Sequence, residues 1–304
     1  MSARTHLDPL AIALMVVLCT IWGVQQVAIK YAIPGVSPVA QSALRSLGAT
    51  VLVGLWAAWR GVRLFERDGT LAAGLTAAAL FAAEFAFIYW ALQYTTASRG
   101  VIFLYTAPFV VSLGAVRMIP GEHLRPSQWA GLACAFAGVL VLFGENLLRP
   151  GGRAWVGDLM MLAAAVFWAA TTLVIKAGPL ARAAPEKTLL YQLAGSAVVL
   201  PLVAAALGEP GVVHITPIVA ASLVFQTCVV ASASYLGWFW LVKHYPATRL
   251  SAFSFMTPVF GVVAGVVFMG DPLTWSVLLA LALVAAGIAA VNRPPAPVGR
   301  PRGP

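Results

Sequence analysis

One carboxylate, that of Glu84, falls near the middle of a long apolar stretch, whereas the other nine acidic residues lie in expected loops or at expected helix ends. A carboxylate in apolar surroundings is stable only when a partner, a proton or water compensates its charge. Glu84 is therefore expected to bind the ammonium group of a ligand or to carry a proton. The alternative is a protonated or hydrogen-bonded glutamate that only holds helices together.

Three arginines are candidates for the opposite task, the attraction of a carboxylate. Arg45 lies within an apolar stretch, and Arg99 and Arg249 lie at the starts of two others. Long arginine side chains near helix ends commonly extend to the lipid headgroups, and this interpretation is favoured over ligand binding for all three. Lys30 and Lys176 end apolar stretches, where a cation suits the carbonyl-rich end of a helix.

Deep aromatic and polar side chains accompany Glu84. Indole and phenol groups need hydrogen-bond partners, and their faces suit apolar, aromatic or cationic ligands, although ordinary helix packing accounts equally well for any one of them. Together they predict a mostly apolar cavity with a few polar contacts, better suited to an amphipathic solute than to a sugar or an inorganic ion. The predicted lining comprises Glu84, Trp22, Gln25, Gln26, Tyr89, Trp90, Tyr105, Trp168, Thr172, Tyr235, Trp238 and Ser254.

Two prolines, Pro108 and Pro258, lie in the middle of apolar stretches. Each is expected to remove one backbone hydrogen bond and to leave the carbonyl of Leu104 or Ser254 without its usual partner. Such a group is tolerated in a membrane helix when water, a ligand or a side chain satisfies it. A hinge or a kink that lines a cavity is therefore predicted, with an inert kink as the alternative.

The composition indicates what kind of chain positions these residues. Hydrophobic residues make up 61% and charged residues 10% of the 304 residues, and the mean hydropathy is +0.90. In soluble proteins about a quarter of all residues are charged, so this chain has too few charges for a soluble exterior. It is therefore expected to be an all-α polytopic membrane protein. The three cysteines lie in separate apolar stretches, which excludes a disulfide framework or a metal motif.

Ten membrane-spanning helices are predicted at about 20 residues per span. They cover residues 10–31, 39–58, 71–93, 98–117, 127–145, 156–177, 188–207, 215–242, 248–269 and 273–291. Asp8, Asp158 and Asp271 are expected to cap the starts of helices, which gives these acids a structural explanation. The proline-rich tail, residues 293–304, is expected to be disordered.

The basic residues predict the orientation of the chain. Of the nineteen lysines and arginines, fourteen fall on one side of this ten-span topology and four on the other, and Arg45 lies inside a span. Because basic residues concentrate on the cytoplasmic side, both termini are expected in the cytoplasm. The net charge of +9 is thereby explained without nucleic-acid binding.

The chain contains a duplication. Residues 84–108 are echoed 150 residues later by residues 234–258, with Trp90 on Trp240, Arg99 on Arg249 and Pro108 on Pro258. Two units follow, residues 1–150 and 151–292, each with five spans. Because five is odd, the second unit enters the membrane inverted relative to the first. Inverted repeats around a central cavity are typical of secondary transporters.

These features together resemble a known family. They are the tryptophan and Ile-Lys pattern of the first and sixth spans, the aromatic-rich third and eighth, the mid-span prolines of the fourth and ninth, and the Gly-Glu or Gly-Asp opening of the fifth and tenth. The pattern resembles the EamA-type, ten-helix branch of the drug/metabolite transporter superfamily, and within it the YddG-type exporters of aromatic amino acids. The resemblance implies a basket of helices around a cavity, and export of small metabolites across the inner membrane of a bacterium.

The favoured function is therefore a secondary carrier that exports small metabolites, foremost amino acids with aromatic or bulky apolar side chains, by alternating access. No GxxxxGK[ST] motif is present, so energy is expected from gradients, without nucleotide hydrolysis and without a cofactor or metal. A broad drug or metabolite efflux carrier and a proton-coupled antiporter are the alternatives. An intramembrane enzyme or a channel is disfavoured, and a monomer is expected to suffice.

Overall fold

The computed structural model describes residues 8–118, 123–147, 152–245, 250 and 252–291. Throughout these ranges the regular structure is helical, apart from one isolated antiparallel bridge between Val36 and Val212. The prediction of an all-α chain with ten apolar spans is confirmed. The remaining residues, among them Arg249, Pro295 and the rest of the predicted tail, lie outside the described part.

The helices follow each other in two halves of five spans. The first half contains α1 (Pro9–Ala32), α2 (Pro38–Trp59), α3 (Leu71–Ala91), α4 (Ala97–Leu104), α5 (Ala107–Met118) and α6 (Pro126–Leu147). The second half contains α7 (Ala154–Ala177), the 3₁₀ turn η1 (Pro179–Arg182), α8 (Pro185–Ala206), α9 (Pro217–Val224), the π-helical segment η2 (Phe225–Ser234), α10 (Tyr235–His244), the 3₁₀ segment η3 (Ala252–Phe255), α12 (Met256–Met269) and α13 (Trp275–Val291).

Length and hydropathy explain why these helices suit a bilayer. Seven spans are long and apolar enough to cross a bilayer, if α4 is counted with α5 and α9 through α10 are counted as one span. Residues 253–269 and 275–291 form two shorter apolar helices. The 22-residue α2 completes the ten, although Gln41 and Arg45 make it less apolar. Apolar side chains on the outer faces of helices, such as Leu55, Leu202 and Val267, are about two-thirds exposed, as expected of a surface that faces lipid.

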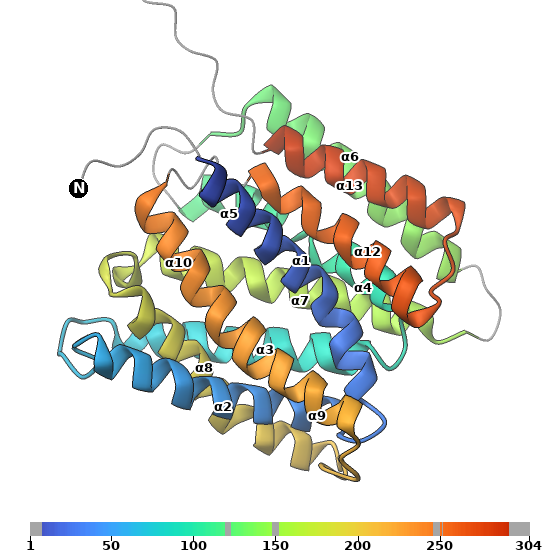
Figure 1. Ribbon diagram of the computed structural model, residues 1–304. Coiled ribbons are helices and arrows are strands. Elements are labelled where there is room, and N and C mark those ends of the chain that lie inside the picture. The colour runs from blue at the N-terminus through green and yellow to red at the C-terminus, as the bar shows by residue number, and fades with distance from the viewer. Residues whose placement is uncertain (1–7, 119–122, 148–151, 246–249, 251, 292–304) are drawn as a thin grey trace, which may run out of the picture.

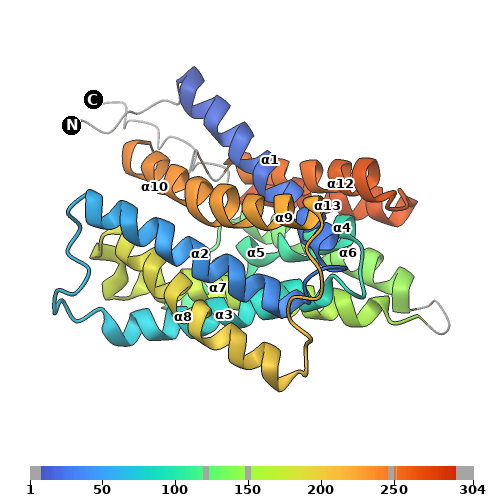
Figure 2. The ribbon, with the colours of Figure 1, turned by 60° about the horizontal axis from the view of Figure 1, so that its bottom comes forward.

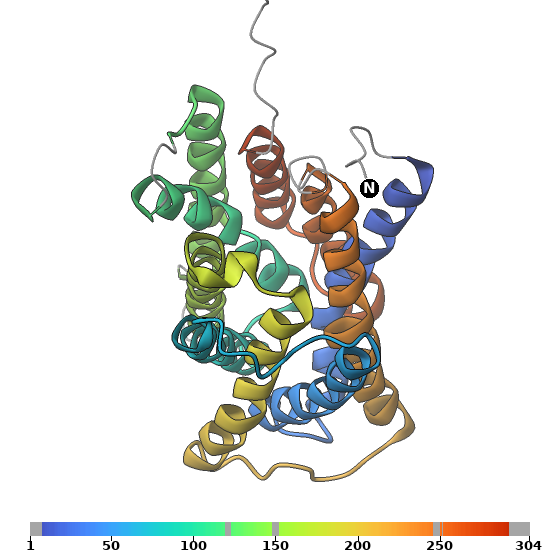
Figure 3. The same ribbon diagram turned by 90° about the vertical axis from the view of Figure 1, so that its left-hand side faces the viewer.

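The two halves pack against each other in pairs of helices (Figure 1). Each of four helices of the first half packs on a helix of the second half: α6 on α13, α2 on α8, α1 on α12 and α3 on α7. These pairs follow the internal repeat. If each span is exchanged for its counterpart in the other half, the pairs α6 with α13 and α2 with α8 remain the same. The pair α1 with α12 becomes α7 with α4 and α5, the pair α3 with α7 becomes α9 and η2 with α1, and these helices also pack together. Figure 2 shows α1, α10, α12 and α13 above α2, α3, α7 and α8, and Figure 3 views the bundle roughly along the helix axes.

Small residues allow two of these pairs to approach closely. A Cβ atom added at Gly131 in α6 would lie 2.7 Å from the carbonyl oxygen of Gly287 in α13, and the converse distance is also 2.7 Å. A Cβ atom at Gly23 in α1 would lie 2.7 Å from the backbone nitrogen of Gly261 in α12. Small residues on these helix faces therefore serve packing within the chain.

Both mid-span prolines start a helical segment, which refines the predicted kinks. The fourth span breaks after Leu104, and Pro108 occupies the first turn of α5, where a missing N–H removes no helical hydrogen bond. The carbonyl of Phe103 accepts hydrogen bonds from the backbone N–H and the hydroxyl of Thr106. Pro258 lies in the first turn of α12, where η3 ends. The ninth span thus changes helix type near the point at which the fourth span breaks.

The eighth span contains a ten-residue π-helix, η2, that its counterpart in the third span lacks. The hydroxyl of Ser232 donates to the carbonyl of Thr227 at 2.8 Å, five residues back. π-Helical turns are frequent at functional sites, because they shift the side chains that follow onto another face of the helix. Here the segment carries Gln226 and ends at Ser234, the residue that matches Glu84 in the duplication.

Candidate functional site

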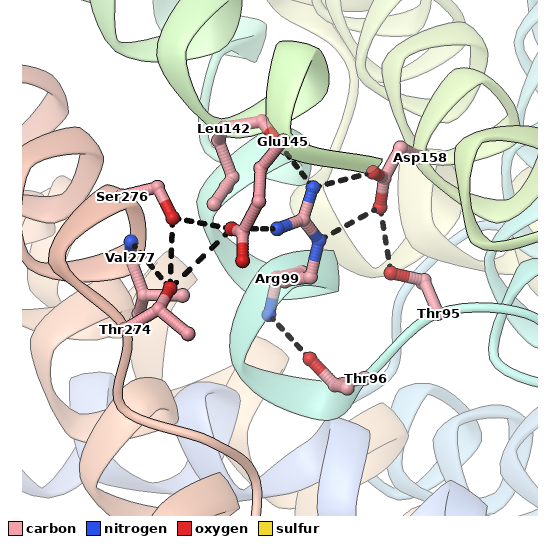
Figure 4. A network of polar contacts seen from close by, with 9 residues as sticks. All are labelled: Thr95, Thr96, Arg99, Leu142, Glu145, Asp158, Thr274, Ser276 and Val277. Atoms are coloured by element: carbon pink, nitrogen blue, oxygen red, sulfur yellow. Dashed lines mark hydrogen bonds and ion pairs between the residues drawn. The ribbon is translucent and has the colours of Figure 1, made fainter. Parts of the chain in front are cut away.

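A buried network of charges joins both halves at one end of the bundle (Figure 4). Arg99, at the start of α4, lies 2.7 Å from Asp158 in α7 and 3.0 Å from Glu145 near the end of α6, and it also donates to the carbonyl of Leu142. Thr95 donates to Asp158 at 2.6 Å. Thr274 and Ser276, at the start of α13, donate to Glu145. The network thus connects spans four, five, six and ten.

Three expectations about charged residues are wrong. The Arg99 side chain is buried and ion-paired, so it does not extend to the headgroups, because the two carboxylates offer it better partners within the protein. Asp158 does not cap a helix, since α7 begins four residues earlier, at Ala154. Asp271 also caps a helix other than the one expected, because its carboxylate accepts a 2.8 Å hydrogen bond from the backbone N–H of Ser98 in α4.

Of two other predictions for charged residues, the one for Asp8 is confirmed and the one for Lys30 is corrected. Asp8 caps α1, and its carboxylate accepts from the backbone N–H of Ala11 at 2.9 Å. Lys30 does bind carbonyls at the end of a helix, but they belong to the segment that follows α3. Its ammonium donates to the carbonyls of Leu92 and Thr95 at 3.1 and 2.8 Å.

A second charged group lies deep within the bundle, where α2 and α3 meet. Arg45 of α2 is fully buried, and Glu84 of α3 is 5% exposed. Their charges interact, yet they form no ion pair. Within the part of the chain that the structure describes, the three side-chain nitrogens of Arg45 and the Oε2 atom of Glu84 have no hydrogen-bond partner. The guanidinium stacks on the ring of Phe85, 4.0 Å from its centre.

Phenol groups surround this charged group. The charge of Arg45 also interacts with Tyr89 and Tyr235, and that of Glu84 with Tyr105 and Tyr235. The predicted lining residues Glu84, Tyr89, Tyr105 and Tyr235 are thus brought together, although they come from spans three, four and eight. Arg45 of span two joins this group through its interactions with Glu84, Tyr89 and Tyr235.

A chain of buried hydrogen bonds extends from Tyr89. Its hydroxyl donates to Gln226 Oε1 of η2 at 2.7 Å, and Gln226 Nε2 donates to Gln41 Oε1 of α2 at 3.3 Å. Gln41 in turn donates to the carbonyls of Ile29 and Val36. These bonds connect α1, α2, α3 and η2, and they fix the orientation of Gln226.

The predicted tryptophans fall into separate groups. Trp22 donates its indole N–H to the hydroxyl of Ser234 at 2.9 Å, and it packs edge to face with Trp238 at 5.8 Å between ring centres. Trp168 packs edge to face with Tyr105 at 5.3 Å, which joins it to the charged group. Trp90 packs instead among aliphatic side chains of α2 and α8, away from the others.

The remaining predicted lining residues are polar and differ in how they are satisfied. Gln25 and Gln26 are buried, and Gln26 Oε1 has no partner among the described residues. The hydroxyl of Thr172 donates to the carbonyl of Trp168 in its own helix at 3.0 Å. Ser254, in η3, is half-buried.

Arg45 is the principal residue whose place the sequence analysis did not foresee. Ser42, Arg45, Ser46 and Ala49 recur at intervals of three and four residues in α2 and are all fully buried. Residues at this spacing share one face of a helix. The signal was therefore present in the sequence, since three polar residues on one face of a membrane span indicate a face that points away from lipid.

The pockets on the surface include two whose linings contain neither Arg45 nor Glu84. A pocket of about 330 Å³ lies between α2 and α8, lined mainly by apolar residues such as Leu44, Leu47 and Pro201. A pocket of about 110 Å³ lies over the ion-pair network and includes Thr96 and Arg99. Among the residues described, no three His, Cys, Asp or Glu side chains are grouped as for a metal ion.

Comparison with known proteins gives consistent matches along the whole chain. The sequence profile of the EamA-like transporter family matches residues 9–144 and 155–293. Two relatives named "probable amino-acid metabolite efflux pump" are 28% identical (Salmonella typhimurium) and 27% identical (Escherichia coli), each over 91% of this chain and 92% of the relative. An uncharacterized transporter of Archaeoglobus fulgidus is 25% identical over 86% of this chain and 87% of its own length.

A solved crystal structure has the same fold. It superposes with a TM-score of 0.68 over 93% of this chain and 96% of its own, at 21% sequence identity. At that identity the likeness concerns the arrangement of the helices alone.

Proposed function

The chain belongs to the EamA-like transporter family, and from this premise we propose that it exports amino acids with aromatic or bulky apolar side chains by alternating access. Membership makes it a multi-pass membrane transporter. The substrate class is supported by the two relatives whose names refer to the efflux of amino-acid metabolites. It is also supported by the aromatic side chains around a buried acid and a buried base.

The single observation that carries the proposal is the group formed by Arg45, Glu84, Tyr105, Tyr235 and Trp168. A buried charge is costly in a membrane, and intramembrane charges commonly mark the path of a substrate or a proton. Aromatic faces nearby suit an apolar or aromatic side chain. The predicted lining from Trp22 to Ser254 belongs to the same proposal, with Glu84 at its centre.

Alternating access follows from the two units of five spans, residues 1–150 and 151–292. Two inverted units supply two equivalent states, one open to each side. Pro108 and Pro258 are the hinges of this scheme, because each starts a new helical segment within a span. The ion pairs of Arg99 with Asp158 bridge the two units and close one end.

The location and the energy source complete the proposal. The distribution of basic residues supports cytoplasmic termini, and the inner membrane of a bacterium is the proposed location. The carrier acts as a monomer without a cofactor. Export proceeds either down the gradient of the substrate or in exchange for a proton carried by Glu84.

Transport into liposomes tests the proposal. Purified protein is reconstituted, and uptake of labelled tryptophan, phenylalanine, threonine and lysine is measured with and without a pH gradient. Saturable uptake of tryptophan and phenylalanine is expected, with threonine and lysine much slower. Loss of only the pH-driven part in Glu84→Gln would assign the proton to that carboxylate. If none of the four amino acids moves although the protein is folded, the substrate class is wrong, and drugs and other metabolites become the leading candidates.

A further inference from the structure

The guanidinium of Arg45 and the carboxyl group of Glu84 lie in one buried group without pairing with each other. Their charges interact, but no nitrogen and oxygen of the two approach within 4.0 Å. The side-chain nitrogens of Arg45 and the Oε2 atom of Glu84 lack hydrogen-bond partners among the described residues. A buried ionisable group without a partner is costly, so both groups are poised to bind one.

The residues nearest along α2 add further unsatisfied polar groups. The hydroxyls of Ser42 and Ser46, on the same face as Arg45, also lack partners in the described part of the chain. The surrounding phenols of Tyr89, Tyr105 and Tyr235 are neutral at physiological pH, because a phenol ionises only near pH 10. The group therefore presents a guanidinium and a carboxyl group, with neutral hydrogen-bonding groups around them.

We propose that Arg45 and Glu84 bind the two ends of a zwitterionic α-amino acid, Arg45 the carboxylate and Glu84 the ammonium. This inference rests on the proposed function and assigns the chemistry of its site. An α-amino acid carries both charges on groups attached to one carbon atom, so one ligand satisfies two neighbouring residues that do not pair with each other. A guanidinium matches a carboxylate in a two-pronged geometry.

The same arrangement explains which ligands are rejected. An amine without a carboxylate leaves Arg45 unpaired, and an acid without an amine leaves Glu84 unpaired. Sites that contain buried polar groups discriminate strongly against analogues that leave those groups without partners. A metal cation is a poor occupant, because the guanidinium of Arg45 would repel it.

Three solutes with the same ring test the proposal in the parent protein. They are phenylalanine, phenethylamine, which lacks the carboxylate, and 3-phenylpropionate, which lacks the amine. Uptake into liposomes is measured by competition against labelled phenylalanine. Phenylalanine is expected to compete at least about tenfold better than either analogue, because each analogue leaves one buried charge unpaired. Equal competition by all three would overturn the proposal while the carrier function stood.

Two variants separate the roles of the residues. Glu84→Gln is expected to shift the preference toward 3-phenylpropionate, and Arg45→Gln to shift it toward phenethylamine. A merely structural role would lower competition by all three solutes in the same proportion, and this result would overturn the proposal. Arg60→Gln is the matched control, because Arg60 is exposed at the end of α2 and its loss should leave the preference unchanged.

Variants that keep the charges, together with the parent protein, keep the test valid if the neutral variants misfold. Arg45→Lys and Glu84→Asp keep the charges and should keep the preference for phenylalanine. If the neutral variants do not fold, discrimination by the parent protein still decides the matter. If folded parent protein moves neither phenylalanine nor any other amino acid, the proposed function fails, and this inference fails with it.

Discussion

Thr95 donates a 2.6 Å hydrogen bond to Asp158, and 150 residues further along Tyr245 donates one of 2.8 Å to Asp8. The first bond joins the end of the third span to the sixth, and the second joins the end of the eighth span to the first. In the ten-span topology the two bonds lie on opposite sides of the membrane. A carrier that opens to one side at a time would break them alternately.

Breaking the first bond should favour opening to the outside. Asp158→Asn removes the ion pair with Arg99, and leaving that buried arginine with one acidic partner fewer is expected to cost about 3 kcal/mol in the closed state. The readout is a cysteine at Thr172, in a protein without Cys19, Cys134 and Cys228, labelled from outside with a membrane-impermeant maleimide. Labelling should become faster in Asp158→Asn.

Asp8→Asn is the matched variant at the other end. Asparagine still caps α1 but weakens the bond from Tyr245, so this variant should favour opening to the cytoplasm and slow labelling from outside. If both variants change the labelling rate in the same direction, the two bonds do not act as opposed closures.

The sequence allowed the number and order of the spans to be predicted, because the apolar stretches and the duplication are strong signals. It did not allow the partners of charged residues to be predicted. Asp158 and Asp271 stand before or near helix starts, and local spacing therefore suggested caps, whereas the structure gives Asp158 to Arg99 and Asp271 to Ser98 of another span. Contacts between residues that lie 59 and 173 positions apart leave no trace in local spacing.

The candidate site was foreseen in part for the same reason. Glu84 stood out because a carboxylate in the middle of an apolar stretch is rare and costly. Arg45 was taken for a side chain that extends to the headgroups, since arginine is long enough to do so. Only the fold shows that it points into the bundle, over the ring of Phe85.

The close approach of α6 and α13 gives a prediction for stability. Gly287→Ala would place a methyl group 2.7 Å from the carbonyl oxygen of Gly131 and 3.0 Å from the ring of Phe109. Overpacking of this kind costs about 1–3 kcal/mol, so the thermal unfolding midpoint in detergent should fall. Gly144→Ala, in α6, is the control, because no atom lies within 4 Å of its added methyl group. A midpoint that falls equally in both would contradict the tight contact.

The loop between α2 and α3 gives a prediction for pH. Lys187 donates to Asp68 at 2.9 Å, and this hydrogen bond, followed by one from Thr70, holds the pKa of Asp68 well below its usual range. Because this pKa is lower in the folded than in the unfolded state, ionised Asp68 stabilises the folded protein at pH values above its unfolded pKa of about 4. This stabilisation is lost as the pH falls below that value.

Thermal unfolding of the parent protein and Asp68→Asn across pH 3 to 8 measures this effect. The parent should be the more stable of the two at pH 7, and the difference should shrink as the pH falls below about 4. Glu66→Gln is the control, because Lys187 contacts only the backbone carbonyl of Glu66. A difference that persists unchanged at pH 3 would show that the charge of Asp68 is not its source.

The hydrogen bond from Tyr89 to Gln226 gives the last prediction. Tyr89 is fully buried, and its hydroxyl is the donor to Gln226 Oε1 at 2.7 Å. Tyr89→Phe leaves that oxygen buried without a donor, which costs about 1–3 kcal/mol and should lower the unfolding midpoint in detergent. Tyr31→Phe is the control, because its hydroxyl donates to the carbonyl of Phe268 at an exposed position, where water replaces it. An equal loss of stability in both variants would argue against a structural role of the bond from Tyr89. Since this bond also orients Gln226 between η2 and α2, we expect Tyr89→Phe to weaken phenylalanine transport as well.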